Sequence, residues 1–336
     1  MKGIVLKELG GPEKLCYDDL PDPVPQENEV LVRLKSAALN HRDLWIRKGL
    51  YADIQLPTIL GSDGSGEIIA LGSSVKSLDV GQPVILNPCF DWGHHTKVQG
   101  SKMKILGMPD NGTYAELVTI PASNALPKPE TLTYGESAAL SLAGMTAYRA
   151  VVTKAQIKAN ETMLVTGIGG GVAVFALQIA KVLGADLFVT SSSEKKIKTA
   201  CNFGALGGVN YLESDWDQKL RHLLNGKSLD VIIDGTGGHI LQKALALIAP
   251  GGKIVSYGAT LGPTKELEIR RLFWKQVSIL GSTMASPTEL TAFLKLYTEN
   301  NLKPPIDKSF TLEKASDAHL RMEQAHQFGK IILKIP

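Results

Sequence analysis

The sequence predicts an α/β protein with two domains, one β-rich and one built on a doubly wound parallel sheet. Three observations lead to this prediction. The chain has 336 residues, which is longer than one ordinary domain. Residues 1–125 consist of short alternating segments separated by Gly, Pro, Asn and Asp, as strands and turns do. From about Pro127, apolar strands alternate with longer helical stretches, which is typical of a parallel sheet covered by helices on both faces.

The β-rich domain is predicted from segments such as GIVLKEL, EVLVRLKSAAL, GEIIALGS and QPVILNP, between which helix is scarce. The closing segment IILKI follows the strands of the second domain but resembles these short strands. We therefore expect it to return to the first domain. The predicted boundaries are 1–125 with 306–336 for the β-rich domain, and 126–305 for the other.

The second domain is predicted to contain six strands and the helices between them. Its last helix begins at Ser286, because Ser286 is a capping residue, Pro287 suits the first helical position and Glu289 completes a capping box. Six strands with five helical or loop crossovers match a complete Rossmann sheet of two mononucleotide halves. The expected strands are 162–168, 186–192, 208–211, 230–236, 253–259 and 278–284, and the other helices are 172–184, 194–204, 216–224 and 239–249.

A glycine-rich turn gives the strongest chemical signal. In ETMLVTGIGGGVAVFALQIAKVLGA a strand runs directly into glycines and then into a helix, whose first free amides can bind a pyrophosphate. The third glycine of a G-x-G-x-x-G pattern is replaced by Val172, so the alternative is a glycine-rich turn without a ligand. We expect a nicotinamide dinucleotide to contact Gly167, Gly169, Gly170, Gly171 and Val172.

The residues after the second strand of this domain favour NADPH over NADH. An Asp or Glu that would accept both ribose hydroxyls is missing there, and hydroxyls followed by two lysines suit a phosphate dianion. Glu194 is counter-evidence, although we expect it to open the next helix, where an acid is favoured by the helix dipole. The expected contacts are Ser191, Ser192, Lys195 and Lys196, with Tyr211 either closing the same pocket or packing.

Composition and charge exclude several classes of function. The formal charge of +3 is spread along the chain without a run of like charges, so nothing predicts a nucleic-acid partner. No apolar run is long enough to span a bilayer, and the N-terminal segment does not resemble a secretion signal. Cys16, Cys89 and Cys201 are too few and too widely spaced for a disulfide framework. We expect a cytoplasmic protein that acts on a small molecule.

Several motifs together resemble the medium-chain dehydrogenase/reductase superfamily, in its zinc-free quinone oxidoreductase (zeta-crystallin-like) branch. They are AALNHRDLWIRKGLY, GSDGSGEIIALG, SAALSLAGMTAYRA, the glycine turn and the closing FGKIILKI, so the resemblance covers nearly the whole chain. It implies a GroES-like first domain, an NADPH cofactor, and reduction of a quinone or an α,β-unsaturated carbonyl compound by hydride transfer.

The resemblance also identifies three positions where zinc-dependent relatives carry metal ligands. Asn40, Ser62 and Leu142 stand there, and an amide, a hydroxyl and an alkyl group do not provide the field that Zn²⁺ prefers. The lobe that holds a structural zinc in some relatives offers only Cys89 with the adjacent His94 and His95, which are expected to lie in a surface loop, with a metal site as the alternative. We therefore expect no metal.

Further site residues come from the resemblance alone. It places Asn40 and Thr146 beside the nicotinamide and Tyr51 near the substrate oxygen, with the alternatives of a turn residue, a helix residue bonded to its own backbone and a loop aromatic. In the run after Asn40, Asp43 is expected to pair or cap rather than to act chemically. The other implied cofactor contacts are Gly258, Ala259, Thr260, Phe328 and Lys330.

The sequence is also compatible with two other functions. One is an alcohol or aldehyde dehydrogenase of the same superfamily, and the other is a non-catalytic dinucleotide-binding protein, because this branch also resembles a lens crystallin. The apolar strand SILGSTM is expected at an edge of the parallel sheet. Pairing of two copies across a twofold axis would cover it, so we expect a homodimer.

Overall fold

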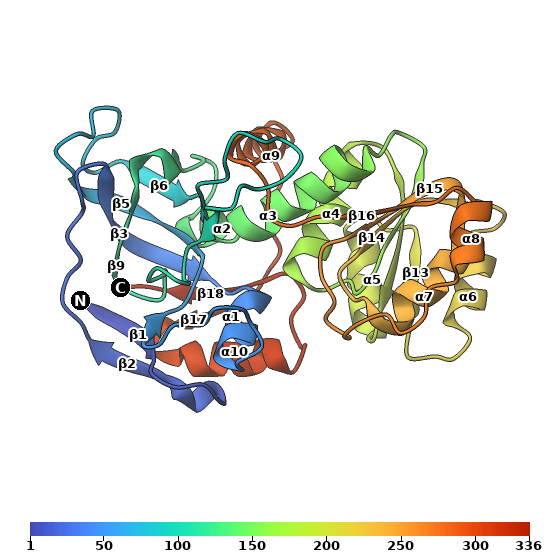
Figure 1. Cartoon of the computed structure of the whole chain (residues 1–336), viewed down its shortest axis with the longest axis horizontal. Helices are drawn as coiled ribbons and strands as arrows, with labels where there is room; N and C mark the ends of the chain where they lie inside the picture. Colours follow the sequence, from blue (N-terminus) through green and yellow to red (C-terminus); the bar gives the residue numbers. More distant parts are fainter. The chain divides into compact units, whose positions relative to one another are not determined.

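The computed structural model describes residues 1–336 and divides into two compact units, which are coloured along the chain in Figure 1. Unit 1 comprises Met1–Ala143 and Ser286–Pro336, and unit 2 comprises Gly144–Ala285. Residues 126–143 and 286–305 therefore cluster with unit 1, although their helical sequence pattern had assigned them to the second domain. Hydrophobic periodicity identifies a helix without indicating which core the helix covers. None of the helices combines the length and the apolar character that crossing a bilayer requires.

Unit 1 is built on a seven-stranded sheet. Its strands follow the order β10-β6-β5-β3-β18-β17, and β9 pairs with β3. The last strand, β18, pairs antiparallel with β3 and parallel with β17, which confirms that the end of the chain returns to this sheet. Two smaller sheets, β2-β1-β4 and β7-β8, complete the strands of unit 1. The strands of all three sheets are β1 (Lys2–Leu6), β2 (Leu15–Asp19), β3 (Glu29–Ala38), β4 (Thr58–Ile59), β5 (Asp63–Leu71), β6 (Pro83–Leu86), β7 (Cys89–Phe90), β8 (Lys104–Ile105), β9 (Leu117–Pro121), β10 (Ala125–Pro127), β17 (Ile306–Thr311) and β18 (Lys330–Lys334).

The helices of unit 1 are short apart from α9, and their caps follow from the sequence. Ser286 Oγ accepts the Glu289 amide hydrogen at 3.3 Å, and the Ser286 amide donates to Glu289 Oε2 at 2.8 Å, so the predicted capping box is confirmed. The helices are α1 (His41–Arg47), α2 (Tyr134–Ala138), α9 (Pro287–Glu299) and α10 (Ala315–Glu323), with α3 (Ser141–Tyr148) crossing the boundary between the units and 3-10 turns at Pro12–Lys14, Ala122–Asn124 and Leu312–Lys314.

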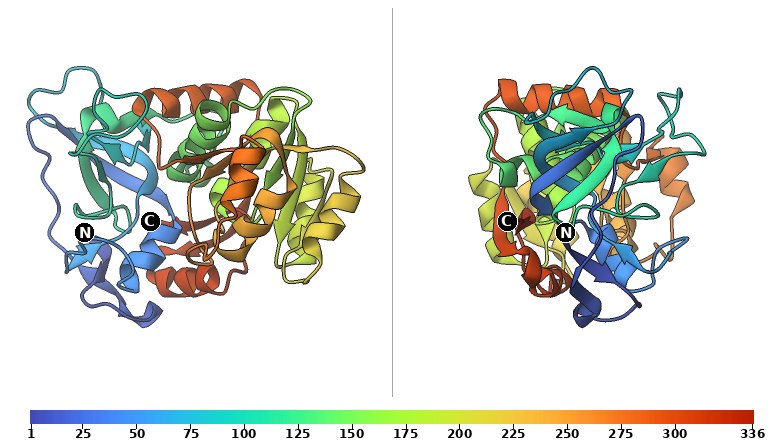
Figure 2. Two further views of the ribbon diagram at one scale, coloured as in Figure 1. Left: turned by 45° about the vertical axis from the view of Figure 1, so that its right-hand side comes forward. Right: turned by 90° about the vertical axis from the view of Figure 1, so that its left-hand side faces the viewer.

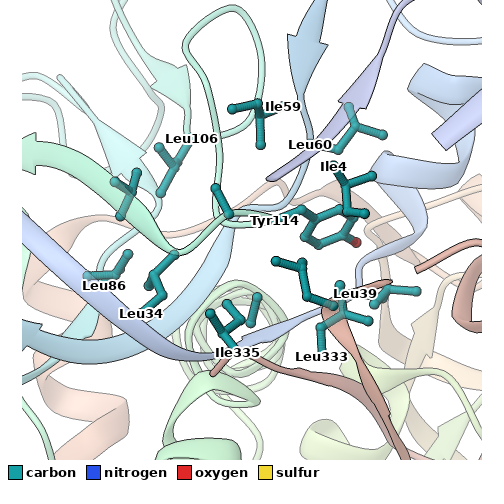
Figure 3. Close-up of a cluster of buried hydrophobic side chains, with 14 of the residues drawn as sticks. Ile4, Leu34, Leu39, Ile59, Leu60, Leu86, Leu106, Tyr114, Leu333 and Ile335 are labelled. Atoms are coloured by element: carbon teal, nitrogen blue, oxygen red, sulfur yellow. The ribbon is translucent and has the colours of Figure 1, made fainter. Parts of the chain in front are cut away.

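The core of unit 1 joins strands that are far apart in the sequence (Figure 3). Ile4, Leu34 and Leu86 come from β1, β3 and β6, while Leu333 comes from β18, and all four are buried. Tyr114 lies among them with its ring buried. Burial of this apolar surface against the sheet holds β3 and β18 in a fixed register, and the functional residues described below lie at the ends of these strands.

Unit 2 contains one six-stranded sheet in which every pair is parallel, in the order β13-β12-β11-β14-β15-β16. This is the strand order 3-2-1-4-5-6 of a Rossmann sheet. Figure 2 shows its helices flanking the strands. The bounds are β11 (Thr162–Val165), β12 (Asp186–Ser191), β13 (Gly207–Asn210), β14 (Leu229–Asp234), β15 (Ile248–Ser256), β16 (Ser278–Gly281), α4 (Gly171–Val182), α5 (Glu194–Asn202), α6 (Trp216–Leu223), α7 (Gly238–Leu247) and α8 (Ile269–Trp274), with a π-helical segment at Arg149–Ala155.

Four of the predicted strands end two or three residues early in the structure. One is β16, which ends at Gly281 instead of 284. For the other three the reason bears on function. β11, β14 and β15 stop two or three residues before the predicted ends at 168, 236 and 259. The residues that follow bond to side chains and to neighbouring loops instead of extending the ladder. The sequence pattern therefore predicted the strands correctly but extended them into the loops that form the site.

Candidate active site

The glycine turn of unit 2 leaves room for a ligand at the start of α4. Gly167 has φ +63°, and a Cβ there would lie 2.5 Å from Thr236 Cγ2, so this position needs glycine for packing. Gly170 has φ −73° and caps α4, and a Cβ there would meet nothing within 4 Å. Open space at a helix N-terminus with free amides fits the pyrophosphate of a dinucleotide.

The end of β12 is tied directly to this turn. The Ile168 amide donates to Thr190 O at 2.7 Å, and the Gly167 amide donates to Thr190 Oγ1 at 3.2 Å. Ser191 is buried, and its hydroxyl donates to Ile168 O at 3.3 Å. The glycine turn and the segment expected to hold the adenosine ribose are thus neighbours, and Ser191 serves to join them.

The segment after Ser191 turns outward into α5. Ser192 and Lys195 are exposed, and Lys196 is half-buried. Glu194 is the first residue of α5, which confirms its expected place at the helix start. The Tyr211 amide donates to Ser191 O at 2.9 Å, and its side chain packs partly buried against the core of unit 2, which is the packing alternative; a role in closing the pocket stays a prediction.

A buried carboxylate, which no sequence motif singled out, organises the next loop. Asp234 ends β14, and its Oδ1 accepts the hydroxyls of Thr166 at 2.6 Å and of Thr236 at 2.7 Å. Its Oδ2 accepts the Gly237 amide hydrogen at 3.1 Å. β14 lies next to β11, where the strand order reverses, which is where Rossmann folds bind ligands. The signal in the sequence was DGTGG, an acid and glycines directly after a buried strand.

The loop after β15 lies against the loop that Asp234 organises. The Tyr257 amide donates to Asp234 O at 2.9 Å, and the Thr260 amide donates to Gly235 O at 3.2 Å. Gly258, Ala259 and Thr260 therefore share the carboxyl edge of the sheet with the glycine turn. Burial raises the pKa of the Tyr257 phenol, with the Asp234 charge acting in the same direction, so the group is a neutral packing element.

In unit 1 a second cluster forms where β3, β5 and β18 meet. Ala38 pairs with Asp63 on β5 and with Ile332 on β18, so the chain beyond Ala38 lies between these strands. Lys330 Nζ donates to Leu39 O at 2.8 Å, to Asn40 Oδ1 at 2.7 Å and to Asp63 Oδ2 at 3.0 Å. The side-chain amide nitrogen of Asn40 donates in turn to Asp63 Oδ2 at 3.0 Å.

Asp63 is fixed from a further side. Its Oδ1 accepts the Leu142 amide hydrogen at 2.8 Å, in the first turn of α3, where a negative charge is favoured by the free helical amides. Both carboxylate oxygens are therefore engaged, and the side chain is fully buried. The family resemblance points to Asn40 and Lys330 separately and does not indicate Asp63, so the cluster itself is a finding of the structure.

Arg42 and Asp43, in the first turn of α1, have different partners. Arg42 Nη1 donates to Ser62 Oγ at 2.8 Å and to Leu106 O at 2.9 Å, and the Tyr51 ring centroid lies 5.2 Å from the guanidinium carbon. Asp43 Oδ2 accepts the backbone amide hydrogen of Asn40 at 2.8 Å, which confirms the capping role of Asp43. Burial raises the pKa of the Asp43 carboxyl, and the Arg42 charge opposes that shift.

The other residues that the resemblance implies are divided between the two units. Tyr51 is exposed, with 37% of its surface accessible. Thr146 is buried on α3 in unit 2. Phe328 lies before β18 in unit 1, and its amide donates to Asp307 Oδ1 at 3.2 Å. The ammonium of Lys330 has three partners within unit 1, so its side chain belongs to the cluster with Asn40 and Asp63.

The loop with adjacent histidines offers a poor donor set. His94 and His95 are exposed, and the Trp92 indole donates to His95 O at 3.0 Å. Cys89 is buried, and burial raises the pKa of its thiol to about 12, which disfavours the thiolate that a metal needs. No three side chains of His, Cys, Asp or Glu in the structure lie together as a metal site would require.

A Rossmann unit with an open glycine turn, joined to a β-rich unit with buried polar residues at its strand ends, defines a nucleotide-dependent oxidoreductase. Residues 26–130 match the family model described as alcohol dehydrogenase GroES-like domain, and residues 171–299 match the one described as zinc-binding dehydrogenase. The chain belongs to the medium-chain dehydrogenase/reductase superfamily.

Relatives along the whole chain carry two kinds of name. A zinc-type alcohol dehydrogenase-like protein, YogA of Leptosphaeria maculans, is 35% identical over 93% of this chain and 92% of its own length. The human quinone oxidoreductase is 30% identical, over 99% of this chain and 97% of its own. A crystal structure described as an NAD-dependent alcohol dehydrogenase is 39% identical, with a TM-score of 0.95 and full coverage of both chains.

The name of one matching model implies zinc, and the residues of this chain do not fit a catalytic zinc. Ser62 Oγ donates to Leu106 O at 2.7 Å and accepts from Arg42, so its hydrogen bonds are made within unit 1. Asn40 is held between Lys330 and Asp63, and Leu142 offers no donor atom from its side chain. A cationic ammonium beside Asn40 also repels a second cation. No step of the chemistry below uses a metal.

Proposed function

We propose that this protein reduces quinones or α,β-unsaturated carbonyl compounds with NADPH, by hydride transfer without a metal. The observation that supports this most is the cluster of Asn40, Asp63 and Lys330, which provides hydrogen-bond donors at the place where zinc-dependent relatives have a Lewis acid. A simple alcohol needs strong stabilisation of an alkoxide, whereas an enone or a quinone is already activated. The proposed substrates therefore match the chemistry that these residues can supply.

The chain's own residues would stabilise the oxygen of the substrate. Asn40 retains one side-chain amide hydrogen beyond its bond to Asp63, and the phenol of the exposed Tyr51 is proposed as a second donor. Thr146 is proposed to contact the nicotinamide. NADPH when bound supplies the hydride. A proton from Tyr51 or from solvent then completes the reduction at the substrate.

We propose NADPH rather than NADH because no acidic side chain occupies the end of β12. Ser192 and Lys195 are exposed there, at the start of α5, where amides and positive charge can meet a 2′-phosphate. In a Lys195→Glu variant we expect the KM for NADPH to rise about tenfold and the KM for NADH to change little. A Lys227→Glu change serves as the control, because Lys227 forms an exposed ion pair with Asp186 and is not proposed to bind cofactor.

The second candidate is an NAD-dependent alcohol or aldehyde dehydrogenase. It is favoured by the names of the YogA-like relative and of the solved structure at 39% identity. NADPH and NADH oxidation should be compared over a panel of quinones, 2-alkenals and simple aldehydes, together with the metal content of the purified protein. Bound zinc with zinc-dependent alcohol turnover would overturn the proposal, and so would faster turnover with NADH. Cofactor binding without turnover of any compound would indicate the non-catalytic alternative.

We also propose that the protein is a homodimer, paired through the edge of the parallel sheet. β16 is the last strand of that sheet and pairs only with β15. Ile279 on β16 is 38% exposed, and Phe273 and Trp274 on the neighbouring α8 are 63% and 83% exposed. A second copy covers both the strand edge and the apolar side chains. Sedimentation at micromolar concentration should give the mass of two chains, and a monomeric mass would overturn this proposal.

The three cysteines support a reducing compartment. Cys16, Cys89 and Cys201 are all free thiols in the structure. Free thiols persist where glutathione keeps them reduced, so we propose that the protein works in the cytoplasm. A reporter fusion that follows the protein in intact cells tests this placement.

A further inference from the structure

The ammonium group of Lys330 is fully committed inside unit 1. Only 3% of the residue is exposed, and its three hydrogens meet Leu39 O, Asn40 Oδ1 and Asp63 Oδ2 at 2.7–3.0 Å. An ammonium carries three donors and no acceptor, so these bonds use its whole capacity. A buried lysine of this kind is costly to desolvate, and the ion pair with Asp63 compensates only where all partners are held in place.

These contacts fix which way the amide of Asn40 faces. The ammonium can only donate, so the atom 2.7 Å from Lys330 Nζ is the carbonyl oxygen. The carboxylate can only accept, so the atom 3.0 Å from Asp63 Oδ2 is the amide nitrogen. A flipped amide would place like charges together at both contacts. One hydrogen on the nitrogen therefore points away from the cluster in a fixed direction.

The contact with Lys330 strengthens that hydrogen as a donor, while Asp63 fixes its direction. Positive charge at the amide oxygen draws electron density from the nitrogen, and hydrogen bonds in a chain polarise one another in a medium of low dielectric constant. Asp63 cannot rotate in response, because the Leu142 amide holds its other oxygen at 2.8 Å. Asn40 is 6% exposed, so the residue is buried but not fully closed off from solvent.

We propose that Lys330 is a positioning residue that orients and polarises the Asn40 amide, so that Asn40 donates to the carbonyl oxygen of the substrate. This inference rests on the proposed function. The β-carbon of the enone accepts a hydride with its electron pair, the C=C π pair moves to form an enolate, and the negative charge develops on the oxygen beside Asn40. The enolate carbon then takes a proton from solvent or Tyr51. Lys330 transfers no proton in this scheme.

A purely structural ion pair predicts a different result. Loss of Lys330 would then lower the stability of unit 1 and reduce the fraction of folded enzyme, but folded enzyme would keep its kcat. Under the proposal, the folded variant loses kcat because the amide hydrogen is weaker and less well directed. The effect would also depend on Asn40, because Lys330 acts only through it.

A double-mutant cycle with 2-cyclohexenone as substrate tests this dependence. Asn40→Ala should lower kcat about 100-fold, as the loss of one oxyanion donor does, and Lys330→Met should lower it about tenfold or more with NADPH affinity unchanged. The double variant should be no slower than Asn40→Ala alone. Lys253→Met is the matched control, because Lys253 donates to Ala155 O in unit 2 at 2.8 Å and should leave kcat unchanged. Additive losses, or an unchanged kcat in folded Lys330→Met, would overturn the proposal.

A measurement without turnover separates this proposal from the proposed function. In protein labelled with ¹⁵N at asparagine, addition of NADP⁺ and the unreactive ketone cyclohexanone should shift one of the two Asn40 side-chain hydrogens downfield. The shift should disappear in Lys330→Met, or in Lys330→Gln if the methionine variant does not fold. If the wild type reduces no enone but shows this shift, the proposed function fails and the positioning role stands. If neither Asn40 hydrogen responds to the ketone, the positioning role fails.

Discussion

Replacing Gly170 by Ala should weaken cofactor binding without weakening the fold. The backbone at Gly170 has φ −73° and ψ 153°, which alanine adopts freely, and its Cβ would meet no atom within 4 Å. The loss of a glycine cap and the lower entropy of the unfolded chain each contribute a few tenths of a kcal/mol with opposite signs, so the free energy of unfolding should change by less than about 0.5 kcal/mol. The added methyl group would occupy the space proposed for the pyrophosphate.

The expected loss of NADPH affinity follows from the cost of fitting one extra methyl group. Overpacking by one methyl group costs about 1–3 kcal/mol, which corresponds to an increase in Kd for NADPH of roughly 5- to 150-fold. The Kd is measured by titration of NADPH fluorescence, and the free energy of unfolding by urea denaturation of the same samples. A Gly170→Ala variant that binds NADPH as tightly as the wild type would refute the assignment of the glycine turn as the pyrophosphate site.

Gly167→Ala is the contrasting variant. Its φ of +63° costs an alanine about 1–2 kcal/mol, and its Cβ would lie 2.5 Å from Thr236 Cγ2, so the fold itself should be destabilised by about 2–4 kcal/mol in total. Loss of binding in Gly167→Ala alone would report damage to the fold. Loss of binding in Gly170→Ala with unchanged stability would show that the glycine turn contacts the cofactor.

Two further predictions concern stability. Ser286→Ala removes the cap of α9 and should lower the free energy of unfolding by about 1 kcal/mol in urea denaturation, whereas Ser286→Asp should restore most of it. Burial lowers the pKa of His319 to about 3, so the unfolded chain gains a proton below about pH 6.5 that the folded protein does not. Stability should therefore fall by up to about 1.4 kcal/mol per pH unit from pH 6 to pH 4, and His319→Leu should flatten this slope while the exposed His326→Gln does not. An unchanged slope in His319→Leu would contradict this account.

Sequence patterns predicted the parts of the fold that depend on local chemistry. The glycine turn, the start of α9 at Pro287 and the place of Glu194 at the start of α5 each follow from residues within one or two turns of chain. The six parallel strands follow from alternation with helices, and the right-handed crossovers then limit the strand order. The ends of β11, β14 and β15 were predicted too late, because their last residues bond to Asp234 and Thr190 through side chains and loops.

The cluster of Asn40, Asp63 and Lys330 could not be predicted by such reasoning. Asn40 and Asp63 are 23 residues apart in the sequence, and Asn40 and Lys330 are 290 residues apart. Their contact depends on the register of β3 with β5 and with β18, which is set by packing of the whole sheet. The family resemblance pointed to Asn40 and Lys330 one at a time, and only the structure shows that they bond to each other.

The way in which β18 joins β3 also has a consequence for folding. Unit 2 is inserted between the two segments of unit 1, so its sheet is made of strands that follow one another and can form early. Unit 1 must instead close a loop that contains all of unit 2 before β18 can pair, and contacts of such sequence separation form slowly. We expect refolding to restore dinucleotide binding before it restores turnover, since Lys330 arrives with the last strand to pair.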